Sequence, residues 1–139
     1  MPALRSVYLA ARIRRRDELE ECRAQLEAAG IEVTATWLTM PPPSEWTDDV
    51  WAHLAELDRA DVLRADGLVL FTEPGELDGG SGRHVEFGMA LALGKPVIVV
   101  GRYENLFQRL PEVTVVADWP AALAVITRPS LALGLTDKY

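Results

Sequence analysis

The sequence has little of what several protein classes require. Its 139 residues include one cysteine, Cys22, and two histidines. One cysteine excludes an internal disulfide, and these residues do not fall into the spacing of a metal site. We therefore expect a reducing, cytoplasmic setting. No apolar run approaches the roughly 20 residues that span a bilayer. The basic residues near the N-terminus follow its short apolar run, which is the reverse order of a secretory signal.

Positive charge is also scarce. Fourteen lysines and arginines against 21 acidic residues give a net charge of -7, which argues against binding nucleic-acid polymers through their phosphates. Small anions are not excluded, because arginines cluster at positions 12 and 14–16. The apolar fraction of 49% and charged fraction of 25% are those of an ordinary globular protein. The length suits one domain, which we expect to cover residues 1–139.

Strand and helix patterns alternate along the chain. Short apolar or alternating runs predict strands at 6–11, 31–38, 67–72, 96–101 and 113–118. Helices are predicted at 16–30, from Ser44 or Thr47 to about 65, at 84–94, and at 119–127 with Pro120 in its first turn. Continuously apolar internal strands joined by helices indicate an α/β fold, a flavodoxin-like doubly wound sheet of about five parallel strands with helices on both faces. Ligands of such sheets bind beyond the carboxyl ends of the strands, at the switch between the first and third.

Glu86 is out of place in its segment. From Val85 to Gly94 every other residue is apolar or glycine, and a helix that is apolar all round is expected to be buried. The glutamate is either a first-turn residue stabilised by the helix dipole or a carboxylate that faces the crevice. In the second case Gly79, Gly80, Ser81 and Gly82 would let a ligand approach the backbone closely.

Asp58 is misplaced in the same way. At 100° per residue it lies at the centre of an apolar stripe formed by Trp51, Leu54, Val62 and Ala65, with Asp61 at the flank. It either reaches water past the sheet edge or points into the same crevice. Two such carboxylates on different elements suggest glycosyl or acid/base chemistry.

The segment "ARIRRRDEL" places arginines at a helix N-terminus, where the dipole disfavours cations. They are either a solvated surface neutralised by the acidic residues that follow, or ligands of an anion such as phosphate near the first strand, Arg12 included. Tyr8 at the end of that strand is either core or part of the site. His84 and Ser81 flank the helix start, and no histidine–aspartate pattern supports a serine hydrolase.

Three motifs in this order resemble the nucleoside 2-deoxyribosyltransferase family, which includes 2'-deoxynucleoside 5'-monophosphate N-glycosidases. They are "YLA" at the first strand, Asp58, Val62 and Asp66 spaced by four, and "GRHVEFGMALALGKP" with its Gly-x-x-x-Glu-x-Gly start. The likeness covers about two thirds of the chain. It implies cleavage of the N-glycosidic bond of a 2'-deoxynucleoside or its 5'-monophosphate without cofactor or metal.

The resemblance also implies roles. Glu86 would be the nucleophile that forms a covalent glycosyl-enzyme, Tyr8 would position it, and Asp58 would contact the sugar or assist the leaving base. A second base or water would then resolve the intermediate. Substrate contacts would come from Arg12, Gly80, Ser81, Gly82 and His84, with Asn105 a candidate because of its loop. The family forms homodimers or larger homo-oligomers, so we expect one here.

Two positions depart from the family pattern. Gly80 stands where an aspartate or serine is common, which favours an alternative: a catalytically inactive nucleotide-binding or sensing module on the same fold. Ala11 and Arg12 replace a Gly-Pro pair, and the arginine-rich loop resembles the 5'-monophosphate N-glycosidases more than the transferases acting on uncharged nucleosides.

Overall fold

The computed structural model describes residues 3–75 and 81–128. Its strands form one parallel sheet in the order β2-β1-β3-β4-β5, so the predicted doubly wound α/β fold is confirmed. The strands are β1 (Ser6–Ala10), β2 (Glu32–Val33), β3 (Gly67–Phe71), β4 (Val97–Val100) and β5 (Val113–Val116). The main helices are α1 (Arg16–Ala28), α2 (Asp48–Arg64), α3 (Gly82–Ala92) and α4 (Trp119–Thr127). Short 3-10 helices lie at Ile13–Arg15, Thr36–Leu38 and Leu106–Arg109.

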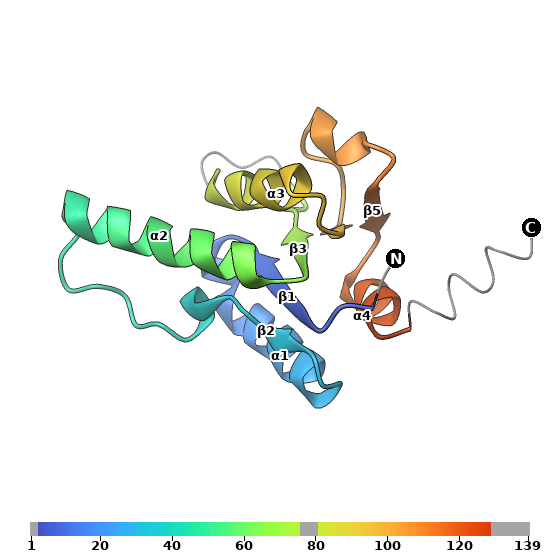
Figure 1. The fold of residues 1–139 in the computed structure, drawn as a ribbon, viewed down its shortest axis with the longest axis horizontal. Coiled ribbons are helices and arrows are strands. Elements are labelled where there is room, and N and C mark those ends of the chain that lie inside the picture. Colours follow the sequence, from blue (N-terminus) through green and yellow to red (C-terminus); the bar gives the residue numbers. More distant parts are fainter. Residues whose placement is uncertain (1–2, 76–80, 129–139) are drawn as a thin grey trace, which may run out of the picture.

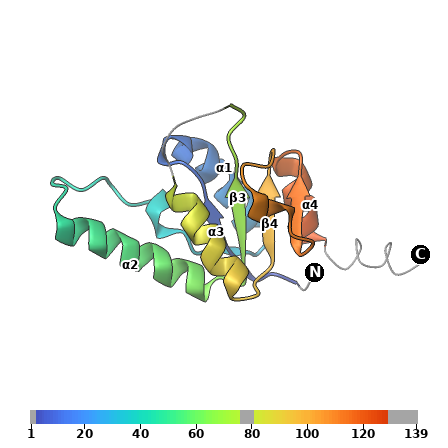
Figure 2. The same ribbon diagram turned by 90° about the horizontal axis from the view of Figure 1, so that it is seen from above.

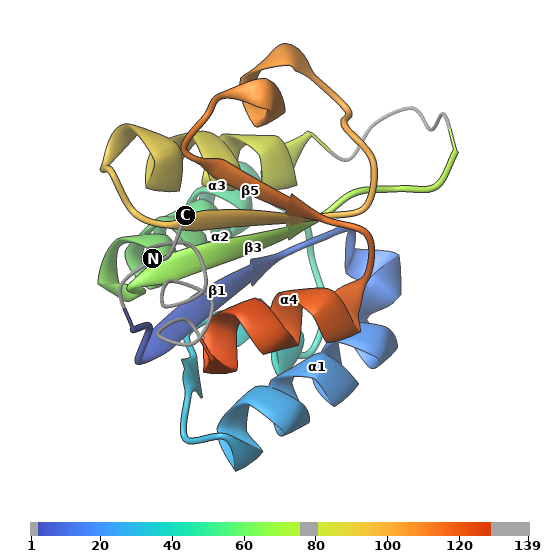
Figure 3. The same cartoon turned by 90° about the vertical axis from the view of Figure 1, so that its right-hand side faces the viewer.

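Helices cover both faces of the sheet. α2 and α3 lie on one face, and α1 and α4 lie on the other (Figures 2 and 3). The central strands β1, β3 and β4 are buried along almost their whole length, which is why they read as continuous apolar runs. Within the described residues, no helix is long and apolar enough to cross a membrane.

Two predicted helix starts are confirmed by their capping contacts. The Thr47 side chain accepts a hydrogen bond from Val50 N at the start of α2, and Pro120 stands in the first turn of α4. The first half of α2 extends beyond the sheet (Figure 1). Only Asp61 and Val62, near the end of α2, are buried within it.

The predicted strand at 31–38 is wrong beyond its first residues. The chain leaves the sheet after Val33, because the residues that follow form hydrogen bonds with Asp61 of α2. Thr36 donates to the Asp61 carboxylate through its backbone N–H at 3.0 Å and its hydroxyl at 2.6 Å, and the Thr34 hydroxyl donates to Asp61 O. Asp61 is therefore a buried structural carboxylate.

The expectation that the helix around Glu86 is buried on all sides is also wrong. α3 buries one face, through Arg83, Phe87 and Ala90, whereas Val85 is 57% exposed and Leu93, directly after the helix, is 54% exposed. Its apolar composition thus reflects an uncovered surface as well as packing. Glu86 lies between the buried face and the exposed face of α3, and it is partly buried.

Candidate active site

Tyr8 and Glu86 are joined directly at the switch between β1 and β3. The Tyr8 side chain is completely buried, and its hydroxyl donates to Glu86 Oε2 at 2.5 Å. Burial, followed by the charge of Glu86, raises the pKa of Tyr8 far above its usual value of 10. The phenol therefore stays protonated and fixes one oxygen of the Glu86 carboxyl group.

Asp58 of α2 completes a pair of carboxyl groups with Glu86. Burial raises the pKa of Glu86 to about 8, with the Asp58 charge acting in the same direction and the Tyr8 hydrogen bond opposing it. Burial, and then the charge of Asp61, raises the pKa of Asp58 to about 6, while a hydrogen bond with Glu86 opposes that rise. Near neutral pH the pair shares one proton. Such a pair can supply one ionised carboxylate and one acid at the same time.

An apolar pocket of about 480 Å³ opens beside Asp58. Three tryptophans contribute to it, and the rings of Trp46 and Trp51 lie 4.3 Å apart between centroids. Trp37 is fixed by its indole N–H, which donates to Leu9 O at 3.1 Å. The pocket is lined by Ile13, Arg16, Trp37, Met40, Pro41, Pro42, Pro43, Trp46, Trp51, Leu54, Ala55, Leu57 and Asp58. A flat apolar group bound there would lie next to the carboxyl pair.

The arginines after β1 converge on Glu73, a residue that the sequence analysis did not single out. Arg12 Nε and an Arg14 terminal nitrogen each lie 3.2 Å from Glu73 Oε1, and an Arg15 terminal nitrogen lies 3.6 Å from Oε2. Arg16 instead donates to Trp37 O. The available signal was an acidic residue two positions beyond a buried strand at the switch point, opposite a basic loop.

The start of α3 carries the remaining expected ligand residues. Ser81 is exposed and precedes the first helical residue, Gly82, which is also exposed. His84 lies two residues further on, with Nε2 3.6 Å from Glu104 Oε1. Burial, and then the charge of Arg83, lowers the pKa of His84. Gly79 and Gly80 lie outside the described residues.

Asn105 belongs to a network that ties the loop after β4 to α3. Its Oδ1 accepts from Phe107 N at 3.0 Å, and its Nδ2 lies 3.3 Å from His84 Nδ1. A buried Arg83 terminal nitrogen contacts both Glu104 carboxylate oxygens, at 2.7 and 2.8 Å. The loop residue is thus placed beside the start of α3, although Glu86 itself is contacted from β1 and α2.

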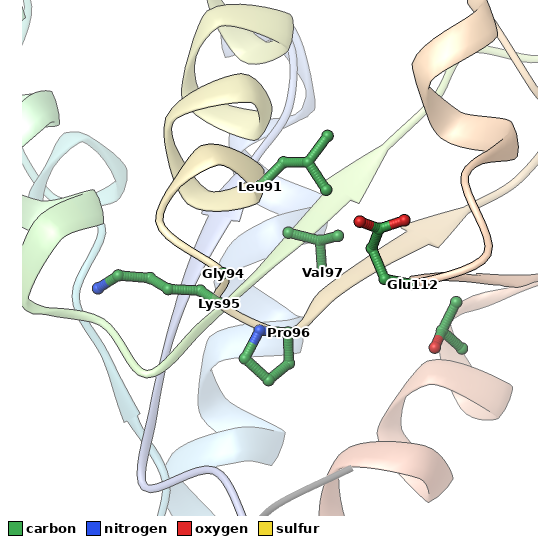
Figure 4. A pocket seen from close by; sticks show the side chains of 7 residues that line it. Leu91, Gly94, Lys95, Pro96, Val97 and Glu112 are labelled. Carbon is green, nitrogen blue, oxygen red and sulfur yellow. The ribbon is translucent and has the colours of Figure 1, made fainter.

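Another pocket, of about 380 Å³, lies at the amino ends of β4 and β5 (Figure 4). Lys95 borders it but extends away from it (Figure 4). The Lys95 ammonium donates to the carbonyl oxygens of Val62, Leu63 and Ala65 at 3.2, 2.5 and 2.5 Å. It thereby caps the carboxyl end of α2, the helix that carries Asp58. In the part of the chain described, no cluster of His, Cys, Asp or Glu could hold a metal ion.

Comparison with known proteins shows which family the chain belongs to and which solved structures share its fold. The sequence profile of the family nucleoside 2-deoxyribosyltransferase matches residues 7–114. No curated protein sequence matches the chain significantly.

Several solved structures share the fold. The 2-deoxyribosyltransferase of Bacillus psychrosaccharolyticus is 18% identical at a TM-score of 0.67, with 85% of this chain and 90% of that chain covered. The CMP N-glycosidase BcmB of Clostridium botulinum is 23% identical at a TM-score of 0.57, with 92% and 98% covered. A conserved protein of Enterococcus faecalis is 19% identical at a TM-score of 0.61, with 91% and 99% covered. The profile match spans most of the chain, and the protein therefore belongs to the nucleoside 2-deoxyribosyltransferase family.

Proposed function

We propose that this protein cleaves the N-glycosidic bond of a 2'-deoxynucleoside or its 5'-monophosphate through a covalent intermediate on Glu86. The observation that carries the proposal is the Tyr8–Glu86 hydrogen bond beside Asp58, at the sheet edge where ligands of this fold bind. The contact holds the Glu86 carboxyl group in one orientation before substrate arrives. Such preorganisation is what a nucleophile at a sugar carbon requires.

The first step proceeds from the form of the pair in which the shared proton lies on Asp58 and Glu86 is ionised, although the two pKa values place that proton on Glu86 more often. The ionised Glu86 forms a bond to C1' as the bond from C1' to the base nitrogen breaks, and that electron pair leaves with the base. The departing nitrogen takes the proton, which Asp58 supplies. Tyr8 stays protonated throughout and keeps the attacking carboxylate in line. The products of this step are the free base and a deoxyribosyl ester of Glu86.

The second step returns the site to its starting state. Either water or a second base attacks C1', the ester oxygen leaves as the Glu86 carboxylate, and Asp58 takes up the proton that the attacking group loses. Water as acceptor makes the protein an N-glycosidase, and a base makes it a transferase. The two outcomes differ only in what reaches the ester.

The apolar pocket beside Asp58 suits the base. Its three tryptophans offer flat surfaces for stacking, and Trp37 is held in place by Leu9 O. Asp58 lines the same pocket, so a base bound there lies within reach of the acid that protonates it. The arginine loop lies at the carboxyl end of β1 and suits a 5'-phosphate.

The decisive experiment is incubation of the protein with the four common 2'-deoxynucleosides and their 5'-monophosphates, with and without a second free base. Free base without an acceptor indicates hydrolysis, and exchange of bases indicates transfer. Glu86→Gln should abolish both hydrolysis and base exchange. The glycosyl adduct that mass spectrometry of the intact wild-type protein detects should also be absent from this variant. Glu56→Gln, which changes an exposed carboxylate paired with Arg59, is the matched control. Unchanged turnover in Glu86→Gln contradicts the mechanism, and no base release by the wild type favours a nucleotide-binding module.

We also propose that the protein acts as a homodimer or larger homo-oligomer in the cytoplasm. Exposed apolar side chains on α3 and on the loop after β4 support an assembly, notably Val85, Leu93, Leu106 and Phe107. The unpaired, buried Cys22 is compatible with a reducing compartment. Light scattering at micromolar concentration tests the assembly, and a monomer there would contradict it.

A further inference from the structure

His84, in the first turn of α3, faces two side-chain amides from the loop after β4. Asn105 Nδ2 lies 3.3 Å from His84 Nδ1, and Gln108 Nε2 lies 3.5 Å from the same ring nitrogen. A nitrogen of a neutral imidazole either donates or accepts a hydrogen bond, depending on which of the two carries the proton. The surroundings of the two amides decide this for His84.

The orientation of each amide is set by a backbone N–H group. Asn105 Oδ1 accepts from Phe107 N at 3.0 Å, and Gln108 Oε1 accepts from Glu104 N at 2.7 Å. Turning either amide over would place its NH2 group against a backbone donor. Gln108 is also completely buried, so bulk water is no alternative partner for its amide. The two oxygens therefore face the backbone, and the two NH2 groups face His84.

Two donors directed at Nδ1 require this nitrogen to accept. The proton of the neutral ring then lies on Nε2, which is 3.6 Å from Glu104 Oε1. A proton on Nδ1, in the other tautomer or in the imidazolium, would point at the NH2 groups. Burial, and then the charge of Arg83, lower the pKa of His84. Glu104 opposes this effect, and Arg12 adds a smaller one in the lowering direction. The contacts therefore select the neutral ring with its proton on Nε2, and burial supports the neutral form.

The same loop is joined to α3 by a second contact. An Arg83 terminal nitrogen lies 2.7 and 2.8 Å from the two oxygens of Glu104, and these side chains are 3% and 13% exposed. Successive residues of the first turn, Arg83 and His84, are thus held by one loop. Glu86 follows in the same turn, and its Oε2 accepts from the Tyr8 hydroxyl. Because the residues of one helical turn are linked by backbone hydrogen bonds, a shift of this turn would displace the Glu86 carboxyl group from Tyr8.

We propose that His84 is a positioning residue for Glu86: its neutral ring, protonated at Nε2, joins the loop after β4 to the first turn of α3. The catalytic part of this inference rests on the proposed function, whereas the state of the ring does not. A role in positioning differs from the substrate contact that the family resemblance implies for His84. Misorienting a nucleophile lowers kcat, while removing a substrate contact that is equally strong in the transition state raises KM.

The first measurement is made on the wild-type protein and needs no turnover. NMR correlation of the ring nitrogens with the ring protons, on isotope-labelled protein at neutral pH, distinguishes a protonated nitrogen from an unprotonated one. We expect His84 to be unprotonated at Nδ1 and protonated at Nε2. The only other histidine, His53, is exposed on α2 and serves as the reference for a ring that exchanges between tautomers. A protonated Nδ1 in His84, or an averaged pattern like that of a freely exchanging ring, overturns the inference.

The second measurement compares variants of the ring in the base-release assay. His84→Phe keeps a flat ring but removes the acceptor, whereas His84→Asn retains an acceptor near the position of Nδ1. We expect kcat to fall about ten-fold or more in His84→Phe, with KM within about two-fold of wild type. His84→Asn should recover most of this loss. His53→Phe, on the exposed surface of α2, is the matched control and should change neither value.

Amide hydrogen exchange measures the joint between the loop and α3 without substrate. We expect faster exchange over residues 83–88 in His84→Phe and wild-type exchange in His84→Asn, because the contact that holds the turn is lost only in the first. If His84→Phe does not fold by its melting curve, Asn105→Asp replaces it: the carboxylate keeps an acceptor for Phe107 N but presents an acceptor to the ring. The His84 ring should then carry a proton on Nδ1, and an unchanged nitrogen pattern refutes the inference.

Three other results would overturn the role of His84. A higher KM with unchanged kcat in His84→Phe indicates a substrate contact. Equal losses in the Phe and Asn variants show that the acceptor at Nδ1 is not what matters. Wild-type exchange in His84→Phe shows that the ring does not hold the turn. If the wild type releases no base, the proposed function fails, and the tautomer and the exchange rates still decide whether His84 holds the start of α3.

Discussion

Replacing Glu86 by glutamine should stabilise the protein at alkaline pH while abolishing its chemistry. The pKa of Glu86 rises from 4.5 to about 8, chiefly through burial. A folded-state pKa above the unfolded value favours folding fully below pH 4.5, and the benefit is lost as pH rises through about 8. Above that pH the ionised side chain costs at most about 5 kcal/mol relative to the unfolded chain.

Glutamine imitates the protonated side chain. Its amide oxygen can accept the Tyr8 hydroxyl, and its amide group can donate to Asp58 as the protonated carboxyl does. Because the cost is shared with Asp58, we expect a gain of about 2–4 kcal/mol at pH 9, or about 8–15 °C in melting temperature. At pH 4.5 the gain should fall within about 2 °C.

Differential scanning calorimetry of both proteins across this pH range measures the effect. Glu56→Gln, on the exposed face of α2, should show no such pH dependence. A melting-temperature difference that is the same at both ends of the range refutes the reasoning, as does a loss of stability at pH 9.

Three further predictions concern the site and its support. The kcat/KM for base release should be bell-shaped, rising through about pH 6 and falling above about pH 8, because only between these values does the carboxyl pair hold one proton; a rate that still rises at alkaline pH argues against a shared proton. Lys95→Met should lower the free energy of unfolding by about 1.5–3 kcal/mol in urea, since it removes the donor to three carbonyls of α2. Arg59→Met should change the free energy of unfolding little. An equal loss in both variants would contradict the role of Lys95 as the cap of α2. Gly101→Ala should cost about 2 kcal/mol or more, because Gly101 has φ +114° and a Cβ would overlap Thr72 Oγ1; a wild-type urea midpoint would contradict this.

The sequence predicted the sheet and the meeting of Tyr8, Asp58 and Glu86 at its edge. Each of the two acids breaks a helical apolar pattern, and parallel topology brings the carboxyl end of β1 close to the helices on one face. The helical periodicity of apolar residues identifies such residues because it predicts which face of the helix each side chain occupies. The roles assigned to the three residues remain proposals.

The misses share a physical origin, which is pairing between side chains far apart in the sequence. The position of Glu73 after a buried strand marks it as a candidate, but the residues around it do not indicate that arginines of the β1–α1 loop will contact it. Nothing local to Asp61 indicates that it will bind Thr36 and end β2 early. The apolar composition of α3 was misread because an uncovered apolar face and a buried one look identical in sequence.

α2 is fixed at one end only. Lys95 and the buried pair Asp61 and Val62 hold its last turns against the body of the protein, while its first turns stand clear of the sheet (Figure 1). Asp58 lies next to the fixed end, and the paired rings of Trp46 and Trp51 lie near the free one. The two ends of α2 therefore differ in support: the end near Asp58 is held by Lys95, and the end near Trp51 borders the aromatic pocket. If the pocket binds the base as proposed, substitution of Trp51 should change which base is accepted while the contact between Tyr8 and Glu86 stays intact.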